Sequence, residues 1–209
     1  RAQKAGYDGV EIHGAHGYIL GQFLSPQYNQ RSDAYGGSMT HRWRLIVDIL
    51  KGVRAVCGPQ FLVGLRLSPE RFGIVLSECL ALCRKVIDDG LVDFLDVSLW
   101  DVFKRPVDAP EDAPSLLQHF ADLERGEVRL TVAGKISTAR HVQRVLDQGV
   151  DFVSIGRAGI LHHDFAQRVL SDPHFEPISL PVRRAYLAQE GLGEAFIDYM
   201  TRWKGFVAD

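Results

Sequence analysis

Cysteine is scarce in this chain, and its few cysteines form no disulfide pattern. The 209 residues include three cysteines, Cys57, Cys79 and Cys83. An odd, sparse count is typical of reduced thiols in the cytoplasm, where we expect this protein. Cys79 and Cys83 lie four positions apart on the apolar side of a predicted helix, so we expect both in the core. The count argues against a disulfide-stabilised secreted domain.

The chain also lacks a strong net charge and a long apolar run. Its formal net charge is −2, which argues against nucleic acid as the main partner because phosphate binding requires a basic surface. No apolar run approaches the roughly 18 residues that a membrane-spanning helix needs. What remains is an ordinary globular composition, 46% hydrophobic and 24% charged, with enough residues for a substantial core.

Short apolar segments alternate with amphipathic segments along the whole chain. Apolar runs of this kind, each followed by a helical pattern, predict a parallel sheet with helices on its outer side. The predicted strands are Asp8–His13, Phe61–Leu67, Phe94–Leu99, Leu130–Ala133 and Phe152–Ile155. Five such units fit either a small doubly wound sheet or the larger part of an eight-stranded barrel.

Helix signals fill the intervals between these strands. The longest predicted helix runs from Thr40 to Val56, with Ser38 as its N-cap and Gly58-Pro59 as its stop. The segment from Arg1 to Tyr7 resembles the end of a helix, so we expect part of the fold to precede Arg1. The other predicted helices are Val75–Asp88, Leu116–Leu123, Thr138–Gln148, Val182–Gln189 and Glu194–Trp203.

The most informative residues follow the first predicted strand. His13 and His16 are three positions apart and Tyr18 follows, with glycines between them that allow a tight bend. Imidazoles can donate hydrogen bonds to a carbonyl oxygen, and a phenol can pass a proton to a carbanion-like carbon. The spacing also suits a metal, but no third ligand lies nearby except Glu11 inside the strand, so we predict no metal site. A purely structural role is the remaining alternative.

Two later strand ends indicate an anion site. The fourth strand leads into Gly134-Lys135 and the fifth into Gly156-Arg157, each just before a predicted helix. A glycine there lets backbone N–H groups approach a phosphate, and barrel enzymes often bind phosphate at their last two strand ends. The alternative is that the glycines only permit tight turns.

Arg66 interrupts the apolar second strand. An unpaired buried guanidinium costs several kcal/mol, so Arg66 should meet an anion or an electron-rich ring. The pyrimidine edge of a flavin is one candidate partner, and a carboxylate such as Glu11 on the neighbouring strand is the other.

The segment from Asp8 to Tyr18 resembles the old yellow enzyme family of FMN-dependent ene-reductases, in its branch with two histidines. The resemblance extends over essentially the whole chain. The further matching segments are Gln22-Phe23-Leu24-Ser25-Pro26, Asn29, Arg31, Asp33, Tyr35-Gly36-Gly37-Ser38, Arg66-Leu67-Ser68-Pro69, Ala133-Gly134 and Ile155-Gly156-Arg157. Where the family usually has Glu-Asn-Arg, this chain has Thr40-His41-Arg42, a change at a helix start.

The resemblance implies a role for each candidate residue. His13 and His16 would bind the substrate's carbonyl oxygen, and Tyr18 would protonate the alkene carbon. Arg66 would lie against the flavin edge. The FMN-binding residues at the last two strand ends would be Ala133, Gly134, Lys135, Gly156 and Arg157.

For the whole chain, the resemblance implies an α/β fold, a (β/α)8 TIM barrel of which residues 1–209 supply strands four to eight with their helices. Strands one to three would be absent, leaving the isolated fragment inactive. The activity implied is that of an FMN-dependent oxidoreductase using NADH or NADPH to reduce electron-poor C=C bonds in enones, dienoyl thioesters or similar compounds. Its partner would be a small α,β-unsaturated substrate, and we also expect a homo-oligomer.

Two alternatives stay open. The chain could be a barrel fragment that binds no flavin and catalyses nothing. It could also belong to another phosphate-binding barrel enzyme, such as an isomerase or an aldolase. That class needs a Schiff-base lysine or a carboxylate base at a strand end, and no strand end offers a good one.

Overall fold

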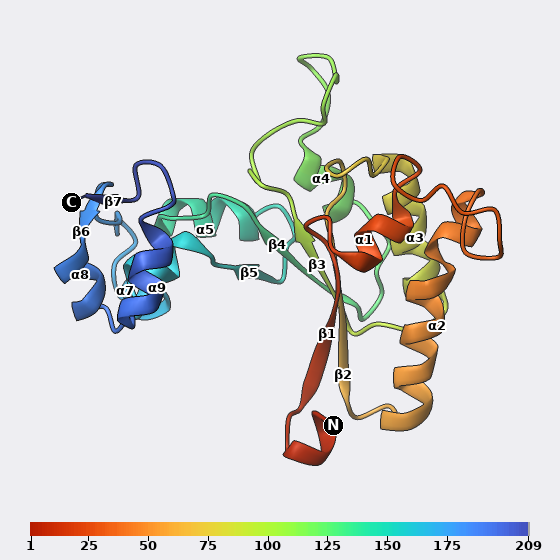
Figure 1. The fold of residues 1–209 in the computed structure, drawn as a ribbon. Helices are drawn as coiled ribbons and strands as arrows, with labels where there is room; N and C mark the ends of the chain where they lie inside the picture. Colours follow the sequence, from red (N-terminus) through yellow and green to blue (C-terminus); the bar gives the residue numbers. More distant parts are fainter. Residues whose placement is uncertain (209) are drawn as a thin grey trace.

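A computed structural model describes residues 1–208 and contains a five-stranded parallel sheet. The strands pair in chain order, each with the next, so that residues 9–154 build the sheet (Figure 1). They are β1 (Gly9–Gly14), β2 (Leu62–Leu67), β3 (Phe94–Ser98), β4 (Arg129–Ala133) and β5 (Phe152–Ser154). All five predicted strands are confirmed, with ends that shift by one residue or, for β5, leave Ile155 outside.

The helix α2 (Met39–Cys57) shows why the sequence pattern was informative. Its N-cap is Ser38, whose hydroxyl accepts a hydrogen bond from the His41 backbone N–H at 3.3 Å. That bond satisfies one of the first-turn N–H groups that have no partner inside the helix. Gly58 ends the helix with φ 74°, a backbone conformation that favours glycine.

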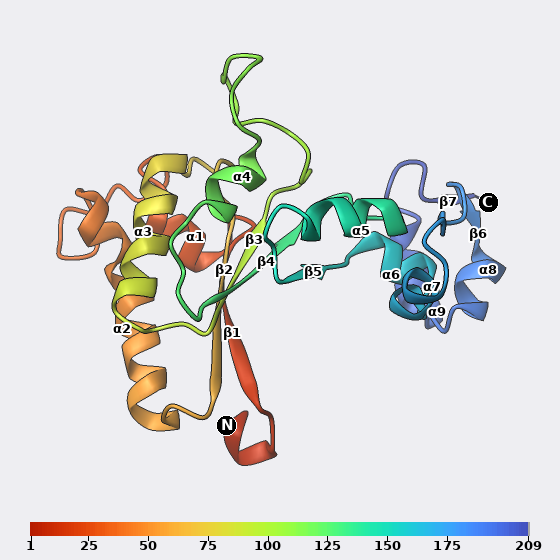
Figure 2. The ribbon, with the colours of Figure 1, turned by 180° about the vertical axis from the view of Figure 1, so that it is seen from behind.

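Helices α2 and α3 (Leu76–Asp88) pack on one side of β1 and β2 (Figures 1 and 2). On α3 the residues at helical spacing are buried, including Cys79 and Cys83, as predicted. The remaining helices after the strands are α4 (Leu116–Ala121) and α5 (Ala139–Leu146).

The two faces of the sheet differ because side chains alternate along each strand. The face toward the helices carries aliphatic residues that are at most 1% exposed, among them Leu65, Leu67, Leu95, Val97 and Val132. These side chains form the centre of the main hydrophobic core. The opposite face carries the polar and charged residues described below.

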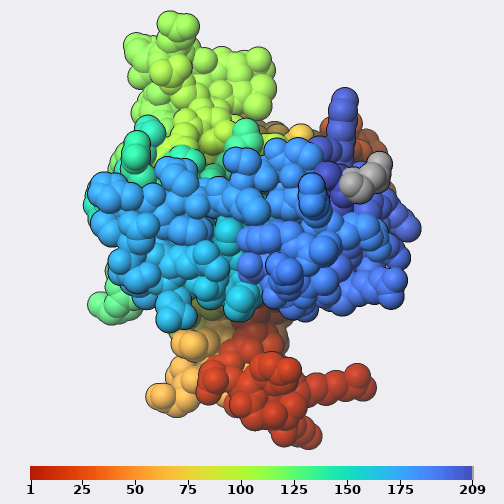
Figure 3. Space-filling view, turned by 90° about the vertical axis from the view of Figure 1, so that its left-hand side faces the viewer, coloured from red at the N-terminus to blue at the C-terminus, as the bar shows by residue number. Residues whose placement is uncertain are grey.

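The C-terminal quarter forms a separate cluster beside α5 and β5 (Figure 1), and this cluster covers the middle of the face shown in Figure 3. Its elements, listed in chain order, are α6 (Arg157–Leu161), α7 (Phe165–Ser171), β6 (Val182–Arg183), α8 (Arg184–Gln189), α9 (Glu194–Met200) and β7 (Val207–Ala208). None of the helices within residues 1–208 is both long enough and apolar enough to cross a lipid bilayer.

Several elements differ from the sequence prediction. The first residues form a short 3-10 helix, Gln3–Ala5, which Gly6 ends at φ 87°. The helix predicted from Val182 begins two residues later, because Val182 pairs with Val207 in a small second sheet. Helices α1 (Ile19–Leu24) and α7 were not predicted, and α6 was expected after Gly156-Arg157 only as a helix without stated bounds.

Candidate functional site

Three aromatic rings meet where β1 ends. The ring centroids of His13 and His16 are 5.1 Å apart, and those of His13 and Tyr18 are 5.3 Å apart. Tyr18 is 62% exposed, so its hydroxyl is accessible to a small molecule. The three predicted catalytic residues therefore lie together at the carboxyl end of the sheet.

The backbone here is held in an uncommon conformation. His16 has φ 60°, which few residues other than glycine adopt, and its N–H donates to the Ser68 hydroxyl at 3.1 Å. Gly17 follows with φ 74°, and a Cβ at that position would lie 2.8 Å from the Phe72 ring. The loop after β2 thus fixes the turn that presents the two histidines.

The environment favours neutral imidazoles. Burial lowers the pKa of His13, and the nearby Arg66 guanidinium lowers it further. Burial also lowers the pKa of His16, with His13 and Arg66 adding to the effect. At neutral pH each ring therefore offers one N–H donor and one acceptor nitrogen.

The loop between β1 and α2 is held by residues that also carried the family resemblance. The Asn29 side-chain amide donates to the carbonyls of Phe23 and Tyr35, each at 2.7 Å. The buried Arg42 guanidinium donates to the Leu24 carbonyl at 3.0 Å. Arg42 is the part of the expected motif that this chain retains, and its role here is structural.

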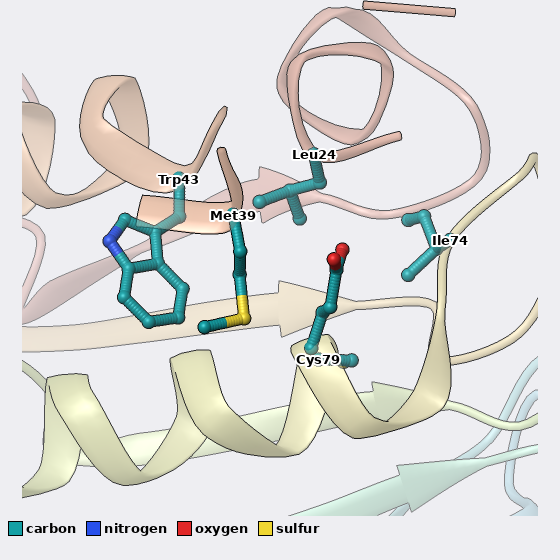
Figure 4. A pocket seen from close by; sticks show the side chains of 6 residues that line it. Leu24, Met39, Trp43, Ile74 and Cys79 are labelled. Carbon is teal, nitrogen blue, oxygen red and sulfur yellow. The ribbon is translucent and has the colours of Figure 1, made fainter. Parts of the chain in front are cut away.

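A cavity of only about 10 Å³ lies beneath this loop, between α1, α2 and α3 (Figure 4). A void of that size holds at most one water, so it is a packing defect and not a ligand site. The labelled residues that line it are Leu24, Met39, Trp43, Ile74 and Cys79.

Arg66 lies in a charged network on the open face of the sheet. Its Nε and Nη2 atoms both donate to one Asp96 oxygen, at 2.9 and 2.5 Å. Its Nε also lies 3.1 Å from a Glu11 oxygen, and the Ser154 hydroxyl donates to Asp96 at 3.1 Å. Burial, and then the Asp96 charge, raise the pKa of Glu11. Of the two predicted kinds of partner, a carboxylate is present. Asp96 accepts two hydrogen bonds from Arg66, whereas the predicted residue, Glu11, makes a single contact with it.

The turn after β4 is shaped by contacts with the turn after β3. Gly134 has φ 152°, and a Cβ there would lie 2.7 Å from the Trp100 carbonyl carbon. The next residue, Lys135, has φ 54° and its ammonium pairs with Asp101 at 2.9 Å. Burial acts to raise the pKa of Asp101, but hydrogen bonds from Lys135 and the Phe103 N–H bring it below its usual value. Lys135 is therefore already partnered, and Gly134 accommodates the protein's own backbone.

Gly156 differs from Gly134 in leaving space. A Cβ on Gly156 would meet nothing within 4 Å, and Gly156 directly precedes the first turn of α6, which begins at Arg157. Ala133, the remaining predicted residue, accepts a hydrogen bond from Leu99 N–H at 2.8 Å. Every predicted residue thus lies at or near the carboxyl edge of the sheet, and Arg66, the next-to-last residue of β2, pairs with His13 of β1 in the strand register.

Sequence reasoning missed Asp96 and Ser68. Asp96 is 1% exposed and lies in an otherwise apolar strand, directly opposite Arg66 in the strand register. A lone acidic residue in an apolar strand was the available signal, because a buried carboxylate needs a partner. Ser68 is 2% exposed, and the residues around it contain no comparable signal.

Comparisons with known proteins identify the family. The model of the NADH:flavin oxidoreductase / NADH oxidase family matches residues 1–174. The chain belongs to this family. It is 31% identical over 182 residues to the NADH:acrylate oxidoreductase of Vibrio harveyi, covering 82% of this chain and 18% of that protein. It is 34% identical over 176 residues to the probable NADH-dependent flavin oxidoreductase YqiG of Bacillus subtilis, covering 81% and 47%.

Solved structures of old yellow enzyme relatives have the same fold. Morphinone reductase aligns with a TM-score of 0.67 at 28% identity, covering 89% of this chain and 48% of that one. The old yellow enzyme homologue from Zymomonas mobilis aligns with a TM-score of 0.66 at 28% identity, covering 84% and 50%. The family resemblance and the expected fold, part of a TIM barrel, are confirmed. The chain spans about half the length of YqiG, morphinone reductase and the Zymomonas mobilis homologue. It spans 18% of the Vibrio harveyi protein.

Proposed function

We propose that residues 1–209 form the C-terminal part of one FMN-binding (β/α)8 barrel, in an NAD(P)H-dependent oxidoreductase that reduces electron-poor C=C bonds. The observation that carries the proposal is the cluster of His13, His16 and Tyr18 at the carboxyl end of β1. Membership in a flavin oxidoreductase family supports it. Enones and dienoyl thioesters are the substrate classes that suit a carbonyl-binding histidine pair.

Two features of the structure fit FMN. Within residues 1–208 the Nη1 atom of Arg66 has no protein acceptor, although the other guanidinium nitrogens face Asp96 and Glu11. Gly156 leaves open space at the other proposed contact. Arg66 would therefore hold the pyrimidine edge. Gly156 and Arg157 would hold the phosphate, beside Ala133, Gly134 and Lys135. When bound, FMN supplies the hydride for the alkene.

The histidines and the tyrosine supply the remaining chemistry. Neutral His13 and His16 can each donate one N–H to the substrate's carbonyl oxygen, which stabilises the negative charge that develops there. The exposed Tyr18 hydroxyl can then give its proton to the alkene carbon. The lowered pKa values of both histidines fit a hydrogen-bonding role better than a proton-donating one.

The outer strands support a larger barrel. Within residues 1–208, β1 pairs only with β2 and β5 only with β4, so each presents one unpaired edge. Unpaired strand edges are normally covered or paired in native proteins. We propose that further strands of the same barrel pair with them, and that the complete protein forms a homo-oligomer.

The test uses the natural protein that contains these residues. It should be purified with bound FMN, and His16→Ala should weaken phenol or enone binding far more than FMN binding. Losing one hydrogen bond to a charged oxygen costs about 1.5–3 kcal/mol. His174→Ala, at an exposed position far along the chain, is the control.

Two results would contradict the proposal. A purified protein without flavin would favour the alternative of a non-catalytic barrel. An equal loss of FMN and phenol affinity in His16→Ala would mean that the ring does not face the substrate.

A further inference from the structure

Arg71 and Trp100 form a stacked pair beside the candidate site. The Arg71 guanidinium carbon lies 3.9 Å from the centroid of the Trp100 ring. Trp100 is 63% exposed and follows β3, while Arg71 follows β2. An exposed tryptophan under a guanidinium is not explained by core packing.

The backbone around Trp100 is held in an uncommon conformation. Trp100 has φ 67°, a conformation that is rare for a bulky residue and is kept only where neighbours impose it. The flanking residues are fixed to the turn after β4, since Leu99 N–H donates to Ala133 at 2.8 Å and Val102 N–H to Gly134 at 3.1 Å. A side chain at Gly134 would collide with the Trp100 backbone. Strain of this kind concentrates at functional sites.

The pair is continuous with the histidine turn. Phe72 follows Arg71 and packs against Gly17, which lies between His16 and Tyr18. Phe72 itself has φ 61°. The loop after β2 therefore joins the Arg71–Trp100 pair to the turn that carries His16 and Tyr18.

Arg71 keeps its charge available. The two nearest acidic residues along these loops have other partners: Glu70 accepts from Lys104 at 2.7 Å and from Val107 N–H at 2.6 Å, and Asp101 pairs with Lys135. Within residues 1–208, Arg71 forms no ion pair. A guanidinium stacked on an indole leaves its edge free, and that edge matches a planar carboxylate or a phosphate in two parallel hydrogen bonds.

We propose that Arg71 and Trp100 form an anion subsite for the reaction, which binds either a carboxylate on the alkene substrate or the diphosphate of the nicotinamide reductant. The proposal rests on the proposed function, because it places the anion on a molecule that reacts beside His16 and Tyr18.

The test measures dissociation constants of the natural protein for three probes: fumarate, its neutral dimethyl ester and NADH. Binding is followed through the indole N–H resonance of Trp100, assigned with Trp100→Phe, so that the readout does not depend on turnover. Arg71→Met should weaken binding of fumarate, NADH or both by roughly 10- to 100-fold, and leave dimethyl fumarate unchanged. Arg105→Met, at an exposed position in the loop after β3, is the matched control.

The outcomes separate the two anion sources. Loss for fumarate alone identifies the substrate carboxylate, and loss for NADH alone identifies the reductant. Unchanged binding of both anions, or equal weakening of the neutral ester, would overturn the subsite. A protein without flavin that still shows the charge-dependent loss would contradict the proposed function and leave the anion site standing.

Discussion

The two faces of the parallel sheet differ in the side chains they carry and in how those side chains affect stability. The face under the helices is entirely aliphatic near the centre, with Leu65 and Leu95 both 0% exposed. The open face places Arg66, Asp96 and Ser154 in one hydrogen-bonded network. The first face stabilises the fold through apolar burial. The second face holds a charged network in which, within residues 1–208, Asp96 Oδ2 accepts every hydrogen bond to that carboxylate and the buried Oδ1 has no partner.

The two faces should also differ in which substitutions they tolerate. A buried aliphatic residue can be exchanged for another of similar volume at modest cost. Removing one member of the charged network leaves the others without partners in a partly buried place. Substitutions on the two faces should therefore differ in both size and cause.

The largest effect is expected on the covered face. Leu95→Ala should lower the free energy of unfolding by about 2–5 kcal/mol, because the side chain is fully buried and its surroundings relax only partly around the cavity left behind. Denaturant unfolding of the natural protein measures it. Leu170→Ala, at a position 87% exposed, is the control and should change stability little. Similar losses for both variants would show that the main core lies elsewhere.

Leu62 tests whether the open face is covered in the complete protein. It is 51% exposed here, on the same face of β2 as Arg66. The proposed barrel would bury it, so Leu62→Ala should cost about 1–3 kcal/mol in the natural protein, by loss of apolar burial. A loss below about 0.5 kcal/mol, as for a surface residue, would argue against closure over this face.

Asp96→Asn tests the charged network. The substitution removes the countercharge of Arg66 and should cost about 1–3 kcal/mol, in the range of hydrogen bonds to charged groups. It should also lower the pKa of Glu11, since a like charge disappears. Asp198→Asn, in the exposed pair with Arg184, is the control for loss of an ion pair. Equal stability of the two variants would mean that the network around Asp96 stabilises the fold no more than an exposed ion pair does.

The smallest effect is a dependence on pH. Because the pKa values of His13 and His16 are lowered on folding, the unfolded chain binds more protons than the folded one below about pH 6.5. Stability should therefore fall as the pH drops through and below that value. His16→Asn should reduce this loss in unfolding experiments across the same pH range. A loss of stability on raising the pH through that window would contradict the direction.

The sequence was sufficient for the elements whose pattern is local. The five strands are confirmed because each is a short apolar run of consecutive residues. Helix α2 is confirmed because its N-cap, Ser38, and its C-cap, Gly58, directly flank it in the sequence. Helix α1 was missed because its six residues have no side-chain cap and contain Gly21. The β6–β7 pair was missed because it depends on contact between distant segments, Val182 with Val207.

The same distinction applies to the candidate site. His13, His16 and Tyr18 are close in sequence, so their proximity was predictable. The partnership of Arg66 with Asp96 depends on the register between β2 and β3, which no single segment encodes. Likewise, the pairing of Lys135 with Asp101 could not be read from the turn that contains Lys135.

The central claim is that the carboxyl edge beside the charged face carries out alkene reduction. Tyr18→Phe in the natural protein tests it most directly, by rapid-mixing kinetics of the two half-reactions. Reduction of the flavin by NADH or NADPH should stay near its wild-type rate, and reoxidation by the alkene should slow about 100-fold or more, because only that step needs the proton. Equal slowing of both half-reactions, or no slowing of either, would contradict the account.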